Sequence, residues 1–424
     1  MKKIVNISLL ILLISGCSYD TNSEVIEKGK LETTVFFASD LHLYSNNLIS
    51  ENNQNYIKEM FTSDGRVQEY DYELVNELVN KVNESNPDFL VLTGDLSYNG
   101  EKDSLIELSK LLDKVNDTKV LVIPGNHDCY SISSFSVKND KYLYEENATY
   151  DDFKEIFNEY GYSDAYSYDR DSLSYIYELS NNKWILMLDT SLSEYNDEYD
   201  MNMVGGFVDE STLSWLENNL KYAKDNNIDV ISATHHNLLV HNELFKDRYT
   251  ISNSDALLGL YSKYDVKLNF SGHLHIQSIK NMTLNDKTIY DIASGSLLDY
   301  GNRYGKLEIY DNCYNYESYK IDKLDNKEDF SNYSFDVFYQ KYYNKSIKSN
   351  ERIYGRNALN VTDFISKVNA YYFDGDYQNI YKLKKENKSL YRKIKRKTDK
   401  YNESYVGTML EVNSNNQHQL LIRK

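Results

Sequence analysis

The chain contains little proline and cysteine and fewer basic than acidic residues, and each shortage limits what the protein can be. Among 424 residues there are 2 prolines and 3 cysteines, and the formal net charge is −18. An acidic protein repels the phosphates of polymeric nucleic acid, so we do not expect that partner. Apart from Cys17, only Cys129 and Cys313 are present. A single pair without a spacing pattern leaves both a disulfide and two separate thiols open.

The apolar run near the N-terminus is too short to span a membrane. It extends from Ile4 to Ile14, whereas a spanning helix needs about 20 residues. Lysines precede the run and small residues follow it, which is the order of a signal peptide. We therefore expect residues 1–16 to be a signal peptide and residues 17–32 to be a polar tether.

The segment Ile14-Ser15-Gly16-Cys17 resembles the lipobox of bacterial lipoproteins. This resemblance implies that Cys17 is acylated and becomes the mature N-terminus. The protein would then be extracytoplasmic and lipid-anchored to the bacterial cell membrane, since two acyl chains suffice for stable anchoring. The alternative is an ordinary secretory signal with an incidental cysteine.

Strand-like and helix-like segments alternate after the tether. Hydrophobic residues make up 41% of the chain, enough for a packed interior, and the length fits one large or two unequal domains. Apolar spacing and β-branched or aromatic runs predict strand 33–40, helix 72–86, strand 88–95, helix 105–115 and strand 119–125. This order favours an α/β core with adjacent strands partly parallel.

The pattern changes after residue 128 and again after residue 321. The elements predicted next are strands 172–179 and 183–191, helix 212–224, strand 229–235, helix 256–264 and strand 266–272. Strands around 277–281, 287–293 and 305–321 are expected to form a second, more antiparallel sheet.

Residues 322–424 are expected to form a smaller, mainly helical accessory domain, because lysine, asparagine and tyrosine dominate there. Within it, residues 382–400 are strongly basic, with Leu383, Leu390 and Ile394 on one helical face. Contact with an anionic lipid surface or with substrate phosphate is one interpretation. A solvated helix face is the other.

Metal-binding residue types follow five of the predicted strands. The strands end in Asp40-Leu41-His42, Gly94-Asp95, Gly125-Asn126-His127-Asp128, His235-His236 and Gly272-His273-Leu274-His275. Because the carboxyl ends of strands border the ligand crevice of α/β sheets, these side chains should meet at one rim. In Asp40/His42 and His273/His275, the i,i+2 spacing would point both side chains the same way on an extended chain.

The five blocks, in this order, resemble the calcineurin-like metallophosphoesterases from about residue 33 to residue 320. The resemblance implies a metallophosphoesterase domain over residues 33–321, an α/β core of two facing mixed β-sheets flanked by helices. It also implies two metal sites with Asp95 bridging. One metal would be held by Asp40, His42, Asp95 and His275, and the other by Asp95, Asn126, His235 and His273. Carboxylate, amide and imidazole ligands suit Mn, Fe or Zn.

The chemistry expected from this ligand set is phosphate ester hydrolysis. Two cations about 3.5–4 Å apart would clamp a phosphate and activate a bridging water, and the resulting hydroxide would attack phosphorus. His127 would protonate the leaving oxygen or stabilise its charge, and Asp128 would orient His127. His236 and His241 either line the substrate pocket or simply pack.

A narrower resemblance concerns the substrate. The stretches DLHL (40–43), GDLSYNGEKDS (94–104) and YYFDGDYQNIYKL (371–383) are similar to bacterial cyclic-nucleotide phosphodiesterases. This implies hydrolysis of a cyclic nucleotide or another phosphodiester. The alternatives are a phosphomonoesterase, such as a nucleotidase or protein phosphatase, and a surface-binding lipoprotein with an inert core. Loss of a ligand would favour the inert form, and none is lost.

We predict that Cys17→Ser releases the protein from the membrane or leaves it unprocessed, because the acylated residue is gone. Membrane fractionation with lipid labelling measures this. Equal labelling of the wild type and the variant would rule out acylation at Cys17.

Overall fold

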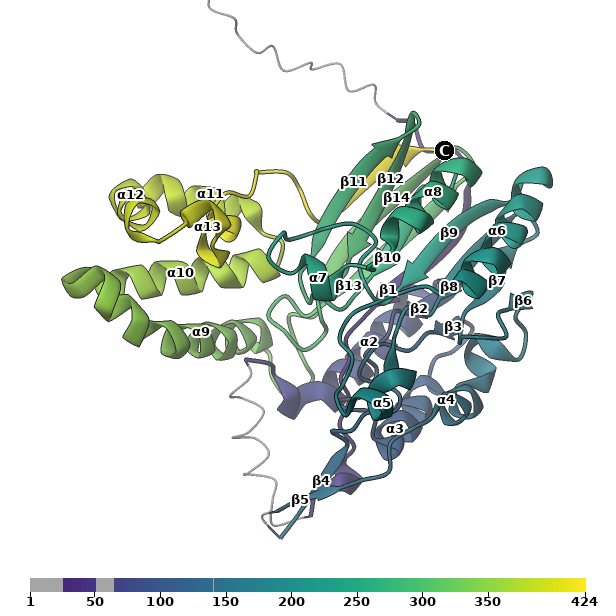
Figure 1. Cartoon of the computed structure of the whole chain (residues 1–424), viewed down its shortest axis with the longest axis horizontal. Coiled ribbons are helices and arrows are strands. Elements are labelled where there is room, and N and C mark those ends of the chain that lie inside the picture. The colour runs from purple at the N-terminus through teal and green to yellow at the C-terminus, as the bar shows by residue number, and fades with distance from the viewer. Residues whose placement is uncertain (1–25, 51–64, 140) are drawn as a thin grey trace, which may run out of the picture.

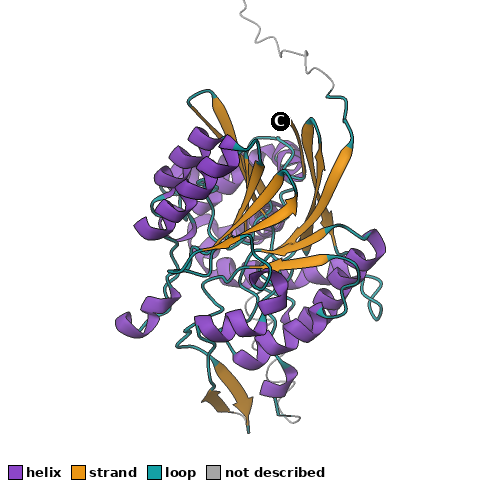
Figure 2. Ribbon diagram, turned by 90° about the vertical axis from the view of Figure 1, so that its right-hand side faces the viewer, coloured by secondary structure: helices purple, strands orange, loops and turns teal. Residues whose placement is uncertain are grey.

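Two β-sheets face each other at the centre of the protein, and helices cover them (Figures 1 and 2). The computed structural model describes residues 26–50, 65–139 and 141–424. In spatial order the first sheet consists of β15 (Gln419–Arg423), β14 (Cys313–Lys320), β13 (Arg303–Tyr310), β1 (Leu31–Ala38), β2 (Phe89–Leu92) and β3 (Lys119–Val122).

Both sheets are mixed, because each contains parallel and antiparallel strand pairs. The order of the second sheet is β11 (Ser278–Leu284), β12 (Lys287–Ala293), β10 (Leu268–Ser271), β9 (Asp229–Thr234), β8 (Lys183–Leu188), β7 (Tyr175–Ser180) and β6 (Ser167–Tyr168). A separate hairpin joins β4 (Phe135–Lys138) to β5 (Lys141–Tyr144). The neighbours β1, β2 and β3 run parallel, as do β8, β9 and β10. The predicted α/β fold with partly parallel strands is confirmed.

The helices of the core are α2 (Asp71–Ser85), α3 (Lys102–Leu112), α4 (Tyr150–Ile156), α5 (Asn196–Tyr199), α6 (Glu210–Asp225), α7 (Lys246–Tyr249) and α8 (Ser254–Tyr264). In α2, buried residues such as Leu74, Leu78 and Val82 recur at helical spacing, so one face packs against the first sheet. The helix ends at Asn86, whose left-handed backbone precedes Pro87. Leu216 of α6 and Leu257 of α8 belong to the apolar cluster on the second sheet.

Aromatic rings join the two sheets. Phe37 of β1 and Phe270 of β10 are fully buried, and their ring centroids lie 3.7 Å apart with nearly parallel planes. Because the two strands belong to different sheets, this stack holds the inner faces together close to the strand ends that carry the site. Burial of two such rings contributes several kcal/mol, on the order of 1.5–3 kcal/mol for each.

The strands after residue 277 are divided between the sheets, so the prediction of a second sheet made of these strands is wrong. β12 pairs with β10, and β11 with β12, in the second sheet. β13 pairs with β1, and β14 with β13, in the first sheet. Apolar alternation within a strand predicts the strand but carries no information about the sheet edge that it joins.

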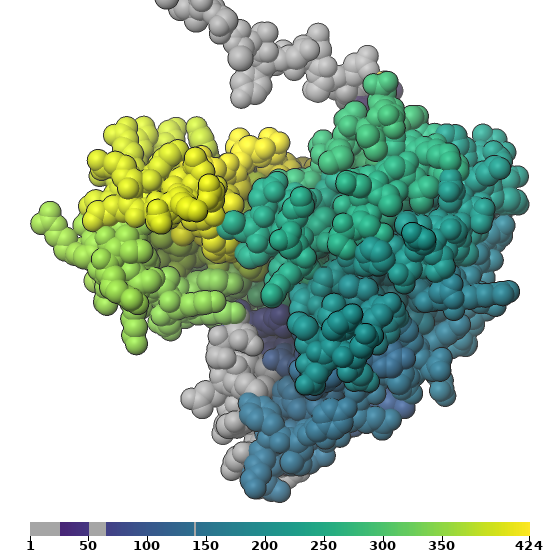
Figure 3. Space-filling model, viewed as in Figure 1, coloured from purple at the N-terminus to yellow at the C-terminus, as the bar shows by residue number. Residues whose placement is uncertain are grey.

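The C-terminal helices form a separate layer beside the sheets (Figures 1 and 3). They are α9 (Phe330–Tyr354), α10 (Ala358–Phe373), α11 (Tyr377–Glu386), α12 (Lys388–Lys397) and α13 (Tyr405–Leu410). The basic segment 382–400 is divided between α11 and α12, and Ile394 is buried in the apolar cluster of this layer. After α13, β15 returns to pair with β14 of the core. The boundary at residue 322 stays a prediction.

Contacts tie the helical layer to the core. The amide of Asn242 donates to the Tyr372 hydroxyl at 2.8 Å, and Arg303 of β13 forms an ion pair with Asp374 at 2.7 Å. Leu274 and Ile276, from the loop after β10, belong to the apolar cluster of the helices. This loop therefore positions the helical layer against the sheets.

The structure also bears on the cysteines and on membrane association. Cys129 and Cys313 are separate buried thiols, so of the two alternatives the disulfide is excluded. Within the described ranges, no helix has both the length and the apolar composition needed to cross a membrane. The predicted signal peptide and Cys17 lie outside the described residues.

Candidate metal centre

Side chains that follow five strands converge at one end of the two sheets. Each of β1, β2, β3, β9 and β10 is followed within four residues by at least one predicted metal ligand. All of these ligands are buried except His275, which is partly exposed. They are Asp40, His42, Asp95, Asn126, His235, His273 and His275.

The first group of possible ligands consists of Asp40, His42, Asp95 and His275, and one ligand atom from each lies within 4.8 Å of all the others. His275 Nε2 is 3.2 Å from Asp40 Oδ1 and 3.3 Å from His42 Nε2. Two imidazole nitrogens and two carboxylates that face one point form a donor set for a divalent cation.

The second group is Asp95, His235 and His273. His235 Nε2 lies 3.2 Å from Asp95 Oδ1 and 3.2 Å from Asn126 Oδ1. Asn126 was predicted as a ligand on this side, and its amide oxygen faces the same point.

The Asp95 carboxylate belongs to both groups. Its Oδ1 faces His235 at 3.2 Å, while its Oδ2 faces His42 at 3.8 Å. Gly125 leaves room for this arrangement, because a Cβ at that position would lie 2.2 Å from Asp95 Oδ1. Glycine is therefore required at position 125, where the loop after β3 comes close to the loop after β2.

Hydrogen bonds on the outer side of three imidazoles determine which nitrogen faces inward. His235 Nδ1 lies 2.8 Å from the Thr93 carbonyl oxygen, and His273 Nε2 lies 3.1 Å from that of Arg248. His275 Nδ1 lies 2.5 Å from Asp299 Oδ2. Each outer nitrogen donates its proton, so the inner nitrogen is the one that would bind a cation, and in His235 and His275 it would release its proton when the cation binds.

Five of these residues adopt the left-handed backbone region, which contradicts the expectation of extended pairs. The φ angles are 54° at Asp40, 40° at His42, 51° at Asp95, 65° at His273 and 60° at His275. The paired side chains converge through tight turns rather than through strand alternation. Non-glycine residues in this region are strained by about 1–3 kcal/mol each, and such strain is typical of functional sites.

Burial keeps two of the imidazoles neutral. It holds the pKa of His42 and that of His273 well below the ordinary histidine value. His42 Nδ1 is buried and has no hydrogen-bond partner among the described residues. Its other nitrogen, Nε2, faces the first group of ligands, so the neutral His42 imidazole can bind a cation through Nε2.

The other two imidazoles balance the carboxylates. Burial lowers the pKa of both imidazoles. Asp95 outweighs this effect at His235 and Asp40 outweighs it at His275, so each pKa rises to about 9. Burial raises the pKa of Asp95, yet the charges of His235 and His127 hold it well below the ordinary value. The Asp95 carboxylate is therefore ionised and its charge can neutralise a cation.

His127 lies beside the two groups without joining either. Its Nε2 is 4.0 Å from Asp95 Oδ2, and its side chain is 33% exposed toward the cavity. Its Nδ1 lies 2.7 Å from the Tyr98 carbonyl oxygen and 3.1 Å from Asn99 Oδ1. Nδ1–H donates to Tyr98, which leaves Nε2 directed at the site.

The predicted role of Asp128 as the residue that orients His127 is wrong. Asp128 accepts hydrogen bonds from the backbone N–H groups of Gly125, Leu96 and Ser97 and from the Ser97 hydroxyl, at 2.8–3.1 Å. Its carboxylate holds together the loops after β2 and β3. The Tyr98 carbonyl takes the orienting role, which sequence cannot reveal because every residue has a carbonyl.

His236 and His241 do not line the cavity at the site, so of the two alternatives for these residues the substrate-pocket role is excluded. His236 Nδ1 accepts from the Thr190 hydroxyl at 2.8 Å, and its Nε2–H donates to the Val204 carbonyl at 3.1 Å. His241 Nε2 lies 3.2 Å from Asp291 Oδ2 in the interior. Both are packing residues.

A cavity of about 420 Å³ opens onto the site. Its walls include Arg66 and three residues of the C-terminal helices, Lys341, Tyr342 and Phe373. Within the described part of the chain, Arg66 makes no side-chain hydrogen bond or ion pair. Sequence reasoning missed Arg66 and Asp299, because neither belongs to one of the five blocks.

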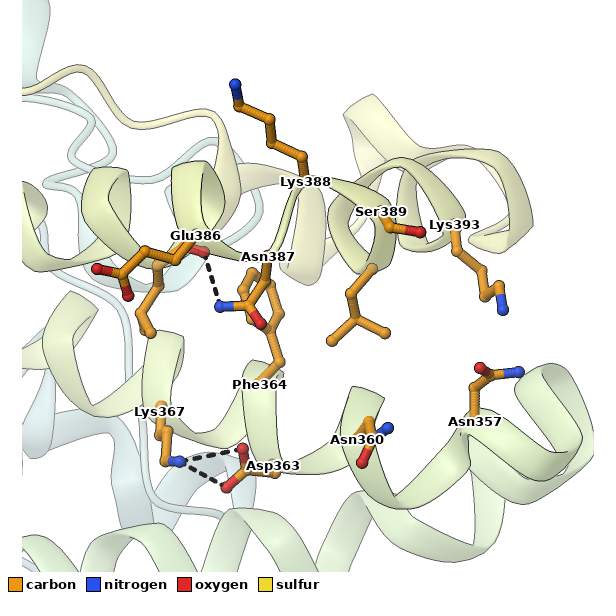
Figure 4. A pocket seen from close by; sticks show the side chains of 12 residues that line it. Asn357, Asn360, Asp363, Phe364, Lys367, Glu386, Asn387, Lys388, Ser389 and Lys393 are labelled. Atoms are coloured by element: carbon orange, nitrogen blue, oxygen red, sulfur yellow. Dashed lines mark hydrogen bonds and ion pairs between the residues drawn. The ribbon is translucent and has the colours of Figure 1, made fainter.

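A second, polar cleft lies within the helical layer, among α10, α11 and α12 (Figure 4). Its volume is about 480 Å³, and it shares no residue with the cavity at the metal centre. Lys367 in its wall is already paired with Asp363 at 2.9 Å, and Asn387 donates to the Leu383 carbonyl at 3.0 Å. Lys367 and Asn387 are therefore bonded within the chain.

Comparisons with known proteins point to one family. The model of the family described as calcineurin-like phosphoesterase matches residues 33–277. A protein of Vesicomyosocius okutanii subsp. Calyptogena okutanii (strain HA), named probable cyclic nucleotide phosphodiesterase, is 24% identical over 202 residues, which cover 47% of this chain and 68% of that protein.

Similar solved structures have low sequence identity. A dimetal phosphatase from Danio rerio is 14% identical with a TM-score of 0.46, covering 69% of this chain and 97% of that chain. A putative 5′-nucleotidase from Staphylococcus aureus is 14% identical with a TM-score of 0.36, covering 65% of this chain and 50% of that chain.

We predict that Asp299→Asn weakens Mn²⁺ binding about 10- to 100-fold, because His275 loses the carboxylate that orients it. Titration of the metal-free protein with Mn²⁺ measures this. The control is Asp169→Asn, which changes another buried carboxylate, bonded to Thr212 and Ser172. Equal affinity in the wild type and Asp299→Asn would show that Asp299 does not support a metal ligand.

Proposed function

The chain belongs to the calcineurin-like phosphoesterase family, and on this basis we propose that it hydrolyses phosphodiesters, with cyclic nucleotides as substrates. It is a metallophosphoesterase, a hydrolase that acts on phosphate ester bonds. The observation that carries the proposal is the buried Asp95 carboxylate, which turns one oxygen toward each group of ligands. The substrate class is supported by the similarity to a protein named as a cyclic nucleotide phosphodiesterase.

We assign two divalent metal ions to the site. Mn, Fe or Zn fits the mixture of carboxylate, amide and imidazole donors. One ion would be held by Asp40, His42, Asp95 and His275, and the other by Asp95, Asn126, His235 and His273. When bound, such a pair supplies Lewis-acid activation of water and neutralises phosphate charge.

The remaining groups of the cavity act on the ester itself. The Arg66 guanidinium is placed to bind a phosphate oxygen, a contact that arginine makes with two parallel N–H groups. When its imidazole is protonated, His127 would donate the Nε2 proton to the leaving oxygen, while Nδ1–H donates to the Tyr98 carbonyl and keeps the ring in place. Burial lowers the pKa of His127, and Asp95 opposes that effect.

The proposed location follows from the sequence alone. A lipid anchor at Cys17 would hold the enzyme at the outer face of the bacterial cell membrane, where it would meet substrates outside the cytoplasm.

The function is tested with a substrate panel in the presence of Mn²⁺. We expect the wild type to hydrolyse 2′,3′- or 3′,5′-cyclic nucleotides faster than simple phosphomonoesters. Asp95→Asn should lose most of this activity and at least one metal ion, because an amide cannot neutralise two cations. Asp169→Asn is again the control. Faster hydrolysis of monoesters would reject the diesterase assignment, and two ions bound at wild-type affinity to Asp95→Asn would reject the bridge.

A second prediction concerns His127. His127→Ala should keep its metal ions and lose about 10²–10⁴-fold in kcat/KM on a nucleotide diester, whose alkoxide leaving group needs a proton. The loss on a bis-nitrophenyl ester should be at least tenfold smaller, since nitrophenolate leaves unprotonated. Both values are measured at matched metal occupancy. Equal losses on the two esters would exclude the acid role and favour electrostatic stabilisation of bound phosphate.

A further inference from the structure

Two cavities adjoin at the metal centre and share part of their walls. Next to the cavity of about 420 Å³ lies a second one of about 540 Å³. Four side chains line both of them, namely Tyr249, Leu274, Tyr342 and Phe373. The ring of Tyr249 lies 4.7 Å, centroid to centroid, from that of the proposed ligand His273. The two cavities therefore lie side by side at these four side chains.

The second cavity lies where the core meets the C-terminal helices. Phe245 of the core and Tyr405 of α13 both line it, with ring centroids 5.6 Å apart. In Figures 1 and 3 the segment that contains α7 lies against the helical layer at this place. Its wall is mainly aromatic and aliphatic, so it suits a flat, apolar group.

One polar atom in this wall lacks a partner. Ser366, on α10, lines the cavity and is only 1% exposed. Its Oγ makes no hydrogen bond to any described residue. Asn369 also lines the cavity, but its amide is held on both sides, because its oxygen accepts from the Tyr405 hydroxyl at 2.5 Å and its side chain is hydrogen-bonded to Tyr342. Buried polar atoms are usually bonded, so the unpartnered Ser366 hydroxyl in the cavity wall indicates a ligand.

We propose that the second cavity binds the heterocyclic base of the nucleotide whose phosphate lies at the metal centre. The placement of the phosphate rests on the proposed function. Tyr342 and Phe373 offer ring faces for stacking, and the unused Ser366 hydroxyl meets a ring nitrogen or carbonyl of the base. The C-terminal helices thereby select the substrate.

An acyl chain is the rival occupant of an apolar cavity. A chain would fill the volume but would leave the Ser366 hydroxyl unsatisfied, whereas a base offers it an acceptor. The polar cleft of Figure 4 shares no wall with the metal centre, so it does not serve as the base site.

The test compares inhibitors that differ only in the base. Adenosine 5′-monophosphate and ribose 5-phosphate compete with bis-nitrophenyl phosphate on the full, Mn²⁺-loaded protein. Stacking and hydrogen bonding to a base should make the nucleotide bind at least about tenfold more tightly. Dodecyl phosphate serves as the acyl-chain probe.

Three variants test whether the second cavity causes the preference for the nucleotide. Ser366→Ala should weaken only the nucleotide, about three- to tenfold, with unchanged stability because the hydroxyl has no partner in the described protein. Val406→Trp changes a partly exposed residue of the cavity wall and should remove most of the preference for the nucleotide by filling the space. Asn360→Ala, on the same helix α10 but in the polar cleft, should change nothing.

The outcomes separate this proposal from the proposed function. A nucleotide preference that falls in Ser366→Ala and Val406→Trp supports the base site, even if cyclic nucleotides are not hydrolysed. Equal inhibition by nucleotide and ribose 5-phosphate overturns it, even if cyclic nucleotides are hydrolysed. Tighter binding of dodecyl phosphate than of the nucleotide, sensitive to Val406→Trp but not to Ser366→Ala, overturns it in favour of an acyl chain.

Discussion

The buried carboxylate of Asp95 is the group on which the arrangement of the site depends. Its two oxygens face different sets of side chains, one set that includes His42 and one that includes His235. An ionised carboxylate without solvent is costly unless positive charge lies next to it. The imidazoles nearby supply part of that charge, and bound cations would supply the rest. The loops after five strands must therefore bring their side chains together around Asp95.

That requirement explains the strained backbone of the site. Asp40, His42, Asp95, His273 and His275 all occupy the left-handed region, which is unfavourable for residues with a Cβ. The facing sheets hold the loops in this conformation through buried contacts such as the stack of Phe37 on Phe270. The packed core thus holds the ligand side chains rigidly, so that they can bind a cation without rearranging.

The loop after β10 connects the metal centre to the C-terminal helices. His273 and His275 face the ligand groups, while Leu274 and Ile276 pack in the apolar cluster of the helices. One short segment thus serves the metal centre and the interface with the helical layer at the same time. The helices contribute Tyr342 and Phe373 to the wall of the cavity, so they form part of the site rather than an appendage to it.

The sequence by itself determined the α/β class, the main strands and helices of the core before residue 272 and the five blocks that meet at the site. Those features are local, because strand propensity, glycine turns and the residues after each strand are all encoded within a few positions. The tertiary structure decided which sheet the strands from Ser278 to Lys320 join, since edge choice depends on long-range pairing. It also decided the partners of each imidazole. Thr93 and Tyr98 act through backbone carbonyls, which carry no sequence signal, and Asp299 lies outside the five blocks. Asp128 holds loops together because folding brings four donors to it.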